Sequence, residues 1–185
     1  MLESNLDLFI NKNIKDVNDL LQWMQKEINY GFIDKNFKKY REDFDDLDFY
    51  KNYYLQSPNL VYRNKIGVCW DQAEFIRYVL NKKHILNDVC FIIKNNLVSS
   101  THTFVIYQID SKLYYFENAF EKYRGIYGPF SKINDIIEKV NNQMDAEEGV
   151  KYSYNFTFLD KMKQGLTCEE YLSQAKKGRN KSILK

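Results

Sequence analysis

The chain has 185 residues, of which 44% are hydrophobic and 28% charged, so it is long enough to bury a core without disulfides or metal ions. Its 27 basic and 25 acidic residues are mixed along the sequence and leave a net charge of +2, so charge predicts neither a nucleic-acid partner nor a membrane surface. With seven Gly and two Pro, the composition predicts a single domain over residues 1–178 and a basic, flexible tail over 179–185.

Cysteine usage and the start of the chain bear on the cellular compartment. The three cysteines, Cys69, Cys90 and Cys168, cannot all pair and lack the short spacing of a zinc site. We therefore expect reduced thiols, no metal and no cofactor. The first residues, 1–5, are acidic rather than basic, and no apolar stretch approaches the roughly 20 residues of a membrane span. These features predict a cytoplasmic protein and leave its oligomeric state open.

The first half of the chain carries one clear helix. Asp16 can cap it, Gly31 is placed to end it, and its apolar residues recur with the helical period. Those residues are Val17, Leu20, Leu21, Met24 and Ile28. From residue 32 to 64, aromatic and charged residues alternate irregularly, which indicates short helices and loops.

The second half alternates helical and strand patterns. A helix is predicted from Cys69, because that residue shares one helical face with Ala73, Ile76 and Leu80. Apolar, β-branched and aromatic runs predict strands over residues 89–93, 102–109, 113–119 and 152–159. Ser131 can cap a further helix, and Thr167 with Glu170 forms a capping box for a last helix that Gly178 would stop. This order favours an α+β fold with a mostly antiparallel sheet.

Cys69 is the candidate nucleophile. The start of a helix lowers the pKa of a thiol, because unpaired amide protons and the positive end of the helix dipole stabilise the thiolate. The same amides can bind an oxyanion, and Gly67 permits close approach of the backbone. Asp71 would oppose a nearby thiolate, so either its side chain points away or the thiol is less activated. On the helix pattern alone, a small buried hydrophobic residue is favoured over a nucleophile for Cys69, because most free cysteines are of that kind.

His102 is the candidate base, since His84 follows two lysines in a connection and is expected to be exposed. If Asp110 and Ser111 form a two-residue turn, Glu117 lies opposite Phe104, on the face of His102. A three-residue turn would instead place Asn118 there. Glu117 is favoured as the residue that orients the imidazole, with Asn118 as the alternative.

At these positions the chain resembles the transglutaminase-like superfamily within the papain-like thiol fold. The matching segments are Gly67-Val68-Cys69-Trp70-Asp71-Gln72-Ala73, His102-Thr103-Phe104-Val105 and Tyr114-Tyr115-Phe116-Glu117. The resemblance implies a nucleophile helix packed on an antiparallel sheet and acyl transfer through a thioester, to which the patterns at Asp16 and Thr167 add helices at the two ends of the chain. It also implies a Cys-His-Asp triad, for which Cys69, His102 and Glu117 are the matching residues.

Two departures accompany the resemblance. Glu117 stands where the family usually has Asp, and Phe104 stands where it more often has Trp. Gln56, Tyr62 and Trp70 are candidates for an added oxyanion donor or a substrate contact.

The sequence thus predicts a cysteine hydrolase, either a peptidase or a deamidase, or an acyltransferase that acts on an amide of a peptide or protein. The alternative is a catalytically inactive module on the same fold that binds a peptide or cell-wall stem.

Overall fold

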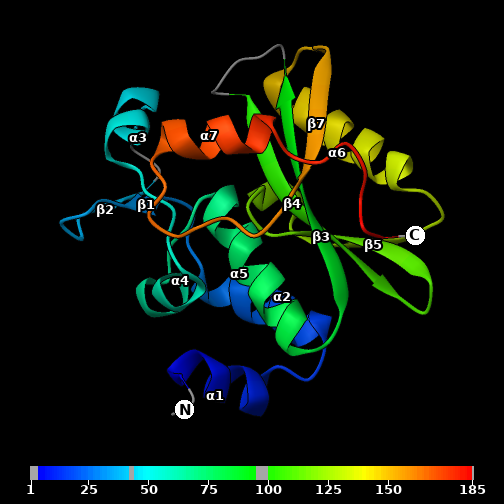
Figure 1. Ribbon diagram of the computed structural model, residues 1–185, viewed down its shortest axis with the longest axis horizontal. Helices are drawn as coiled ribbons and strands as arrows, with labels where there is room; N and C mark the ends of the chain where they lie inside the picture. Colours follow the sequence, from blue (N-terminus) through cyan, green and yellow to red (C-terminus); the bar gives the residue numbers. More distant parts are fainter. Residues whose placement is uncertain (1–3, 42–43, 95–99, 185) are drawn as a thin grey trace.

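The computed structural model describes residues 4–41, 44–94 and 100–184 (Figure 1). The chain starts with helices and a small hairpin, and continues with the sheet and its covering helices. In the first part these elements are α1 (Asn5–Asn13), α2 (Val17–Glu27), β1 (Phe32–Ile33), β2 (Lys39–Tyr40), α3 (Asp46–Asn52) and α4 (Pro58–Asn64).

The second part begins with the helix predicted from Cys69 and contains the main sheet. Its elements are α5 (Cys69–Lys82), β3 (Leu86–Lys94), β4 (Thr101–Ile109), β5 (Lys112–Glu117), the 3-10 turn η1 (Glu121–Tyr123), β6 (Gly125–Phe130), α6 (Ile133–Glu148), β7 (Tyr154–Leu159) and α7 (Cys168–Lys176). The five-stranded sheet has the order β6-β5-β4-β3-β7, with every neighbouring pair antiparallel. This arrangement confirms the predicted α+β class.

The sheet separates two hydrophobic cores. Because side chains alternate along a strand, Phe91 and Val105 face α5, whereas Ile92 and Ile106 face α6. Figure 1 shows α1, α2, α4 and α5 gathered on one side of the sheet and α6 on the other. The predicted stripe of α5 is buried against the sheet. This packing fixes the start of α5 over β4 and β5.

The hairpin between β4 and β5 has the predicted two-residue turn. Asp110 and Ser111 have φ values of +49° and +61°, which is the left-handed pair of a type I′ turn. Ile109 pairs with Lys112, and the same register continues to Val105 opposite Phe116. The predicted register is therefore confirmed, and it places Glu117 on the His102 side of the hairpin.

Several boundaries differ from the sequence patterns. No clear hydrophobic pattern in the sequence marked helix α1 or strand β6. Strand β6 contains Gly128 and Pro129, which are depleted in strands. It lies at the edge of the sheet, where Pro is tolerated. Helix α2 ends at Glu27, well before Gly31, because its C-cap Ile28 is already extended. Ser131 does not cap α6; the N-cap is Lys132, without a side-chain bond.

The segment after residue 178 is docked rather than free. Arg179 pairs with Phe158 of β7 through two backbone hydrogen bonds of 2.8 Å, and its guanidinium contacts Asp88 at 2.7 Å. Leu184 is 6% exposed in the α6 core. The expected flexible tail is therefore corrected for residues 179–184, because buried Asp88 attracts Arg179. Lys185 lies outside the described residues.

Candidate active site

Cys69 is the first residue of α5, following the extended N-cap Val68. The N–H groups of this first turn have no acceptor within the helix, so they and the helix dipole face an anion placed there. Gly67 is required at this approach, since a Cβ at residue 67 would lie 2.9 Å from the Cβ of Asp71. Cys69 as a whole is 6% exposed and belongs to the core that α5 shares with the sheet.

Asp71 is bound to the loop that precedes Cys69. Its carboxylate accepts hydrogen bonds from the backbone N–H of Val68 at 3.1 Å and of Gln56 at 2.8 Å, and from the Tyr53 hydroxyl at 3.2 Å. Burial raises the pKa of Asp71 to about 7, although these donors partly counter the rise. Asp71 therefore holds the loop before Cys69 and adds little negative charge at the thiol.

His102 and Glu117 form a direct pair. The His102 Nε2 lies 2.7 Å from Glu117 Oε2, and both residues are 1% exposed. The other carboxylate oxygen of Glu117 accepts from the backbone N–H of Ala119 at 2.7 Å and of Phe120 at 2.9 Å. The Tyr115 hydroxyl also donates to Oε2. With four donors around it, Glu117 is suited to carry a negative charge inside the protein.

The remaining imidazole nitrogen, Nδ1, is left for Cys69, whose side chain interacts with His102. Burial alone would lower the pKa of His102, but the charge of Glu117 and the bonds to Cys69 and Glu117 raise it to about 10. Burial likewise tends to raise the pKa of Glu117, yet His102 and the donors lower it below its usual value. The pair therefore exists as imidazolium and carboxylate at neutral pH.

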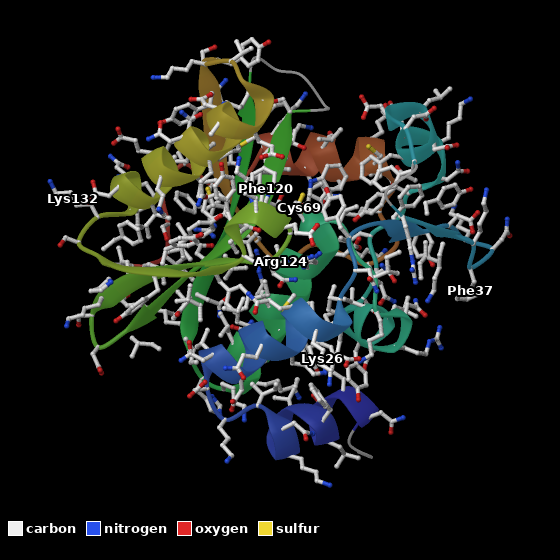
Figure 2. All side chains as sticks on the ribbon, turned by 180° about the vertical axis from the view of Figure 1, so that it is seen from behind. Lys26, Phe37, Cys69, Phe120, Arg124 and Lys132 are labelled. Atoms are coloured by element: carbon white, nitrogen blue, oxygen red, sulfur yellow. The ribbon has the colours of Figure 1, made fainter. Side chains whose placement is uncertain are left out.

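Aromatic rings fix the plane of the imidazole. Phe120 stacks on His102 with ring centroids 4.3 Å apart and an interplanar angle of 8°, and Phe104 lies nearly parallel on the strand at 5.9 Å. Figure 2 shows Cys69 and Phe120 in the middle of one face of the molecule. Phe120 and Tyr115 were not predicted as site residues, because aromatic residues are common throughout this sequence.

Asn118 serves a different contact. Its amide donates to Gln72 Oε1 at 2.8 Å, and Gln72 donates to the Gly67 carbonyl at 2.8 Å. Asn118 therefore supports the loop that precedes Cys69, whereas Glu117 occupies the position beside His102. The structure thus brings Cys69, His102 and Glu117 together, and it does not use the Asn118 alternative.

The three candidates for an added oxyanion or substrate contact are engaged elsewhere. Gln56 donates to the Ile66 carbonyl at 2.9 Å. The ring of Tyr62 packs on Trp23 and lies under the Lys65 ammonium at 4.2 Å. Trp70 stacks on Tyr171 with centroids 4.1 Å apart, and its indole N–H is buried without a partner among the described residues. These contacts correct the expectation that Gln56 or Tyr62 serves Cys69, because both are held by the packing around α4.

A residue that the sequence did not single out does reach the thiol. Tyr30 follows α2, and its hydroxyl lies close enough to the side chain of Cys69 for the two groups to interact. Residue 30 belongs to no periodic pattern, so no local signal in the sequence could have found it.

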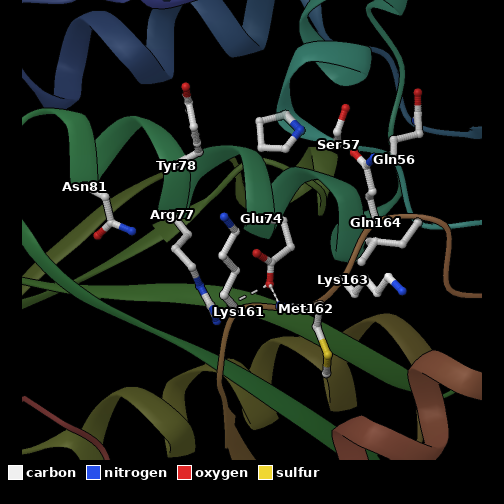
Figure 3. A pocket seen from close by; sticks show the side chains of 12 residues that line it. Gln56, Ser57, Glu74, Arg77, Tyr78, Asn81, Lys161, Met162, Lys163 and Gln164 are labelled. Atoms are coloured by element: carbon white, nitrogen blue, oxygen red, sulfur yellow. Dashed lines mark hydrogen bonds and ion pairs between the residues drawn. The ribbon is translucent and has the colours of Figure 1, made fainter. Parts of the chain in front are cut away.

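A separate cavity of about 420 Å³ lies along the opposite side of α5 (Figure 3). Its lining includes Glu74 and Arg77, which form a buried ion pair at 3.6 Å, and Arg77 also donates to the Leu159 carbonyl at 2.7 Å. None of the three residues Cys69, His102 and Glu117 lines this cavity. We therefore do not assign it to the chemistry of the thiol.

The other cysteines have environments unlike that of Cys69. Cys168 also starts a helix, but burial and the nearby Asp46 and Glu169 raise its pKa to about 11. Burial and Asp88 raise the pKa of Cys90 well above its usual value.

His84 is exposed, as expected. Within the described ranges, no helix is both long and apolar enough to cross a membrane.

Cys69 at the start of α5 thus lies against the antiparallel sheet of an α+β fold, beside the hydrogen-bonded pair of His102 and Glu117. A family model for the transglutaminase-like domain matches residues 3–124, which include all three groups. The chain therefore belongs to the transglutaminase-like family. The search of curated proteins gives no match.

Proposed function

We propose that this protein is a cysteine hydrolase or acyltransferase that opens an amide through a thioester on Cys69. The observation that carries the proposal is the unbroken series from Cys69 through His102 to Glu117, closed by the 2.7 Å contact between His102 Nε2 and Glu117 Oε2. Membership of the transglutaminase-like family, which often consists of enzymes of this kind, supports the proposal.

The geometry suits a defined order of steps. The Cys69 thiolate attacks the amide carbonyl carbon, and the carbonyl electron pair moves to oxygen, where the first-turn N–H groups of α5 can bind it. When the carbon–nitrogen bond breaks, the His102 imidazolium gives its proton to the leaving amine. Neutral His102 then takes a proton from water or from an amine that attacks the thioester. Throughout, Glu117 stabilises the charged imidazole and keeps Nδ1 directed at the sulfur.

Whether water or an amine receives the acyl group is a separate choice. Both nucleophiles react with the same thioester, so the three residues of the series serve either outcome. We propose an amide of a peptide or protein as the substrate. The three free, buried cysteines support a reducing, cytoplasmic location.

The test uses 4-nitrophenyl acetate, an activated ester that needs no specific recognition. We expect a burst of one equivalent of nitrophenol per chain, with the acetyl group mapped to Cys69 by mass spectrometry. Cys69→Ser should abolish the burst. The matched control is Cys168→Ala, which removes a cysteine at another helix start and should leave the burst unchanged.

Two further observations complete the test. Addition of a primary amine should shorten the life of the acetyl adduct if acyl transfer is supported, whereas unchanged decay would favour hydrolysis. Slow, equal acetylation of Cys69, Cys90 and Cys168 would refute the enzyme and favour the inactive peptide-binding module.

A further inference from the structure

Tyr30 is held beside the nucleophile by the backbone. The preceding residue, Asn29, receives the N–H of Gly67 on its carbonyl at 3.1 Å and donates its own N–H to the Lys65 carbonyl at 3.0 Å. These bonds join the strand-like segment after α2 to the loop that ends at Cys69. The position of Tyr30 relative to Cys69 is therefore set by main-chain bonds two residues from the thiol.

The turn after Tyr30 also requires a special residue. Gly31 has φ = +138°, and a Cβ there would lie 2.2 Å from the Tyr40 carbonyl oxygen. Only glycine combines this backbone angle with such a close approach. The chain can therefore leave α2, place Tyr30 over Cys69 and turn at once into β1.

The side chain of Tyr30 has two different ends. Overall it is 39% exposed, yet its hydroxyl is buried and interacts with the side chain of Cys69. Burial, followed by the charges of Cys69, Glu117 and Asp71, raises the pKa of Tyr30 well above its usual value. The hydroxyl therefore keeps its proton and can act as a donor, whereas the ring forms part of the outer surface.

Space around the sulfur shows from which side a carbonyl can arrive. Between α5 and the sheet, next to Cys69, Gln72 and Asn118, the cavity measures only about 10 Å³, which is room for roughly one water molecule. An acyl group cannot enter there. It must approach from the side of the sulfur that Tyr30 covers, where the ring of Tyr30 forms part of the outer surface.

Resting on the function proposed above, we propose that Tyr30 is a catalytic residue, the side-chain donor of the oxyanion site. When the sulfur–carbon bond forms, the carbonyl electron pair moves to an oxygen on the carbon bonded to sulfur. A hydroxyl in contact with the sulfur reaches that oxygen by a small rotation, opposite the first-turn N–H groups of α5. When the intermediate collapses, the pair returns to the carbon–oxygen bond and the leaving group departs.

The experiment compares two reactions at the same sulfur. Acylation by 4-nitrophenyl acetate passes through an oxyanion, whereas alkylation by iodoacetamide is a displacement at a CH₂ group and forms none. For Tyr30→Phe we expect the acylation rate constant to fall about 10²-fold, the typical effect of one lost donor. Alkylation should stay within about threefold, because a weaker hydrogen bond raises both the pKa and the nucleophilicity of the thiol.

Tyr50→Phe is the matched control, because Tyr50 is 46% exposed and its surroundings include Glu169 of α7 rather than Cys69. It should leave both rates unchanged. Faster acylation and alkylation in Tyr30→Phe would show that Tyr30 only covers the thiol, and an equal fall in both would show that it only supports the thiolate or the fold. Either result overturns the inference. Failure of both reagents to modify Cys69 in the wild type would instead refute the proposed function, and this inference with it.

Discussion

Glu117→Gln isolates the charge of the carboxylate from its shape. The retained oxygen can still accept from the N–H groups of Ala119 and Phe120, which now bind Glu117 at 2.7 and 2.9 Å. The new amide NH₂ group would then face His102 Nε2. Because this NH₂ group can only donate, it can bond to Nε2 only when Nε2 is unprotonated and the imidazole carries its proton on Nδ1. That tautomer directs a hydrogen at Cys69 and cannot take the thiol proton.

The size of the effect follows from the pKa of His102. Its rise from 6.5 to about 10 corresponds to roughly 5 kcal/mol at about 1.36 kcal/mol per pH unit. Burial opposes the rise, and the charge of Glu117 is the largest contribution in its favour. Loss of that charge should therefore reduce the thiolate–imidazolium pair at neutral pH on the order of 10²-fold, which corresponds to about 3 kcal/mol.

The assay is the rate of iodoacetamide alkylation of Cys69 between pH 5 and 10. The wild type should be reactive across the neutral range, whereas Glu117→Gln should react about 10²-fold more slowly at pH 7. The alkylation rate of the variant should approach that of the wild type only at a pH high enough for the Cys69 thiol to ionise without an imidazolium beside it. Glu121→Gln is the matched control, since the Glu121 side chain is 82% exposed and contacts only Arg124 among the described ion pairs. Superimposable pH profiles for wild type and Glu117→Gln would refute the role of this carboxylate.

Three other perturbations test the surroundings of the site. In Gly67→Ala the new Cβ would lie 2.9 Å from the Cβ of Asp71. This variant should lose about 1–3 kcal/mol of unfolding free energy in urea and should be alkylated more slowly. Wild-type values of both would show that the loop accommodates the extra methyl group without strain. Ser111→Gly, at φ = +61°, should stabilise the hairpin by about 1 kcal/mol without changing alkylation; a lower midpoint would contradict the turn. Because the pKa of His102 is raised, protonated His102 stabilises the fold fully below pH 6.5, and this contribution is lost towards about pH 10. Because the pKa of Glu117 is lowered, ionised Glu117 stabilises the fold above pH 4.5. The excess stability of wild type over Glu117→Gln should therefore peak between pH 4.5 and 6.5, and a constant difference across pH would refute the ion pair.

The parts of the site that depend on local patterns could be predicted from the sequence. The period of the apolar residues places Cys69 on the buried face at the start of α5, and both are local properties of the chain. The pairing of Glu117 with His102 follows from one two-residue turn, because antiparallel register is fixed by the loop that joins the strands. These two predictions use contacts within one helix or one hairpin.

The remaining parts depend on contacts between distant segments. Tyr30 reaches Cys69 only because Asn29 bonds to the loop before α5, and nothing in residues 28–32 reports that pairing. In the same way, Arg179 is docked because Asp88 is buried on β3, about 90 residues earlier. The basic residues at the end of the chain favoured a tail in solvent. Their charge alone does not show that the buried carboxylate of Asp88 binds Arg179.

The presence of Glu rather than Asp at residue 117 has a physical explanation in the hairpin. Residue 117 lies diagonally across from His102, one strand away, and diagonal neighbours in a sheet are about 7–8 Å apart at their backbones. The carboxylate must span that gap with one oxygen while the other stays 2.7 Å from the N–H of Ala119. An Asp side chain is shorter by one carbon–carbon bond, about 1.5 Å, and would lose one of the two contacts. The longer side chain therefore lets one residue both close the end of β5 and orient the imidazole.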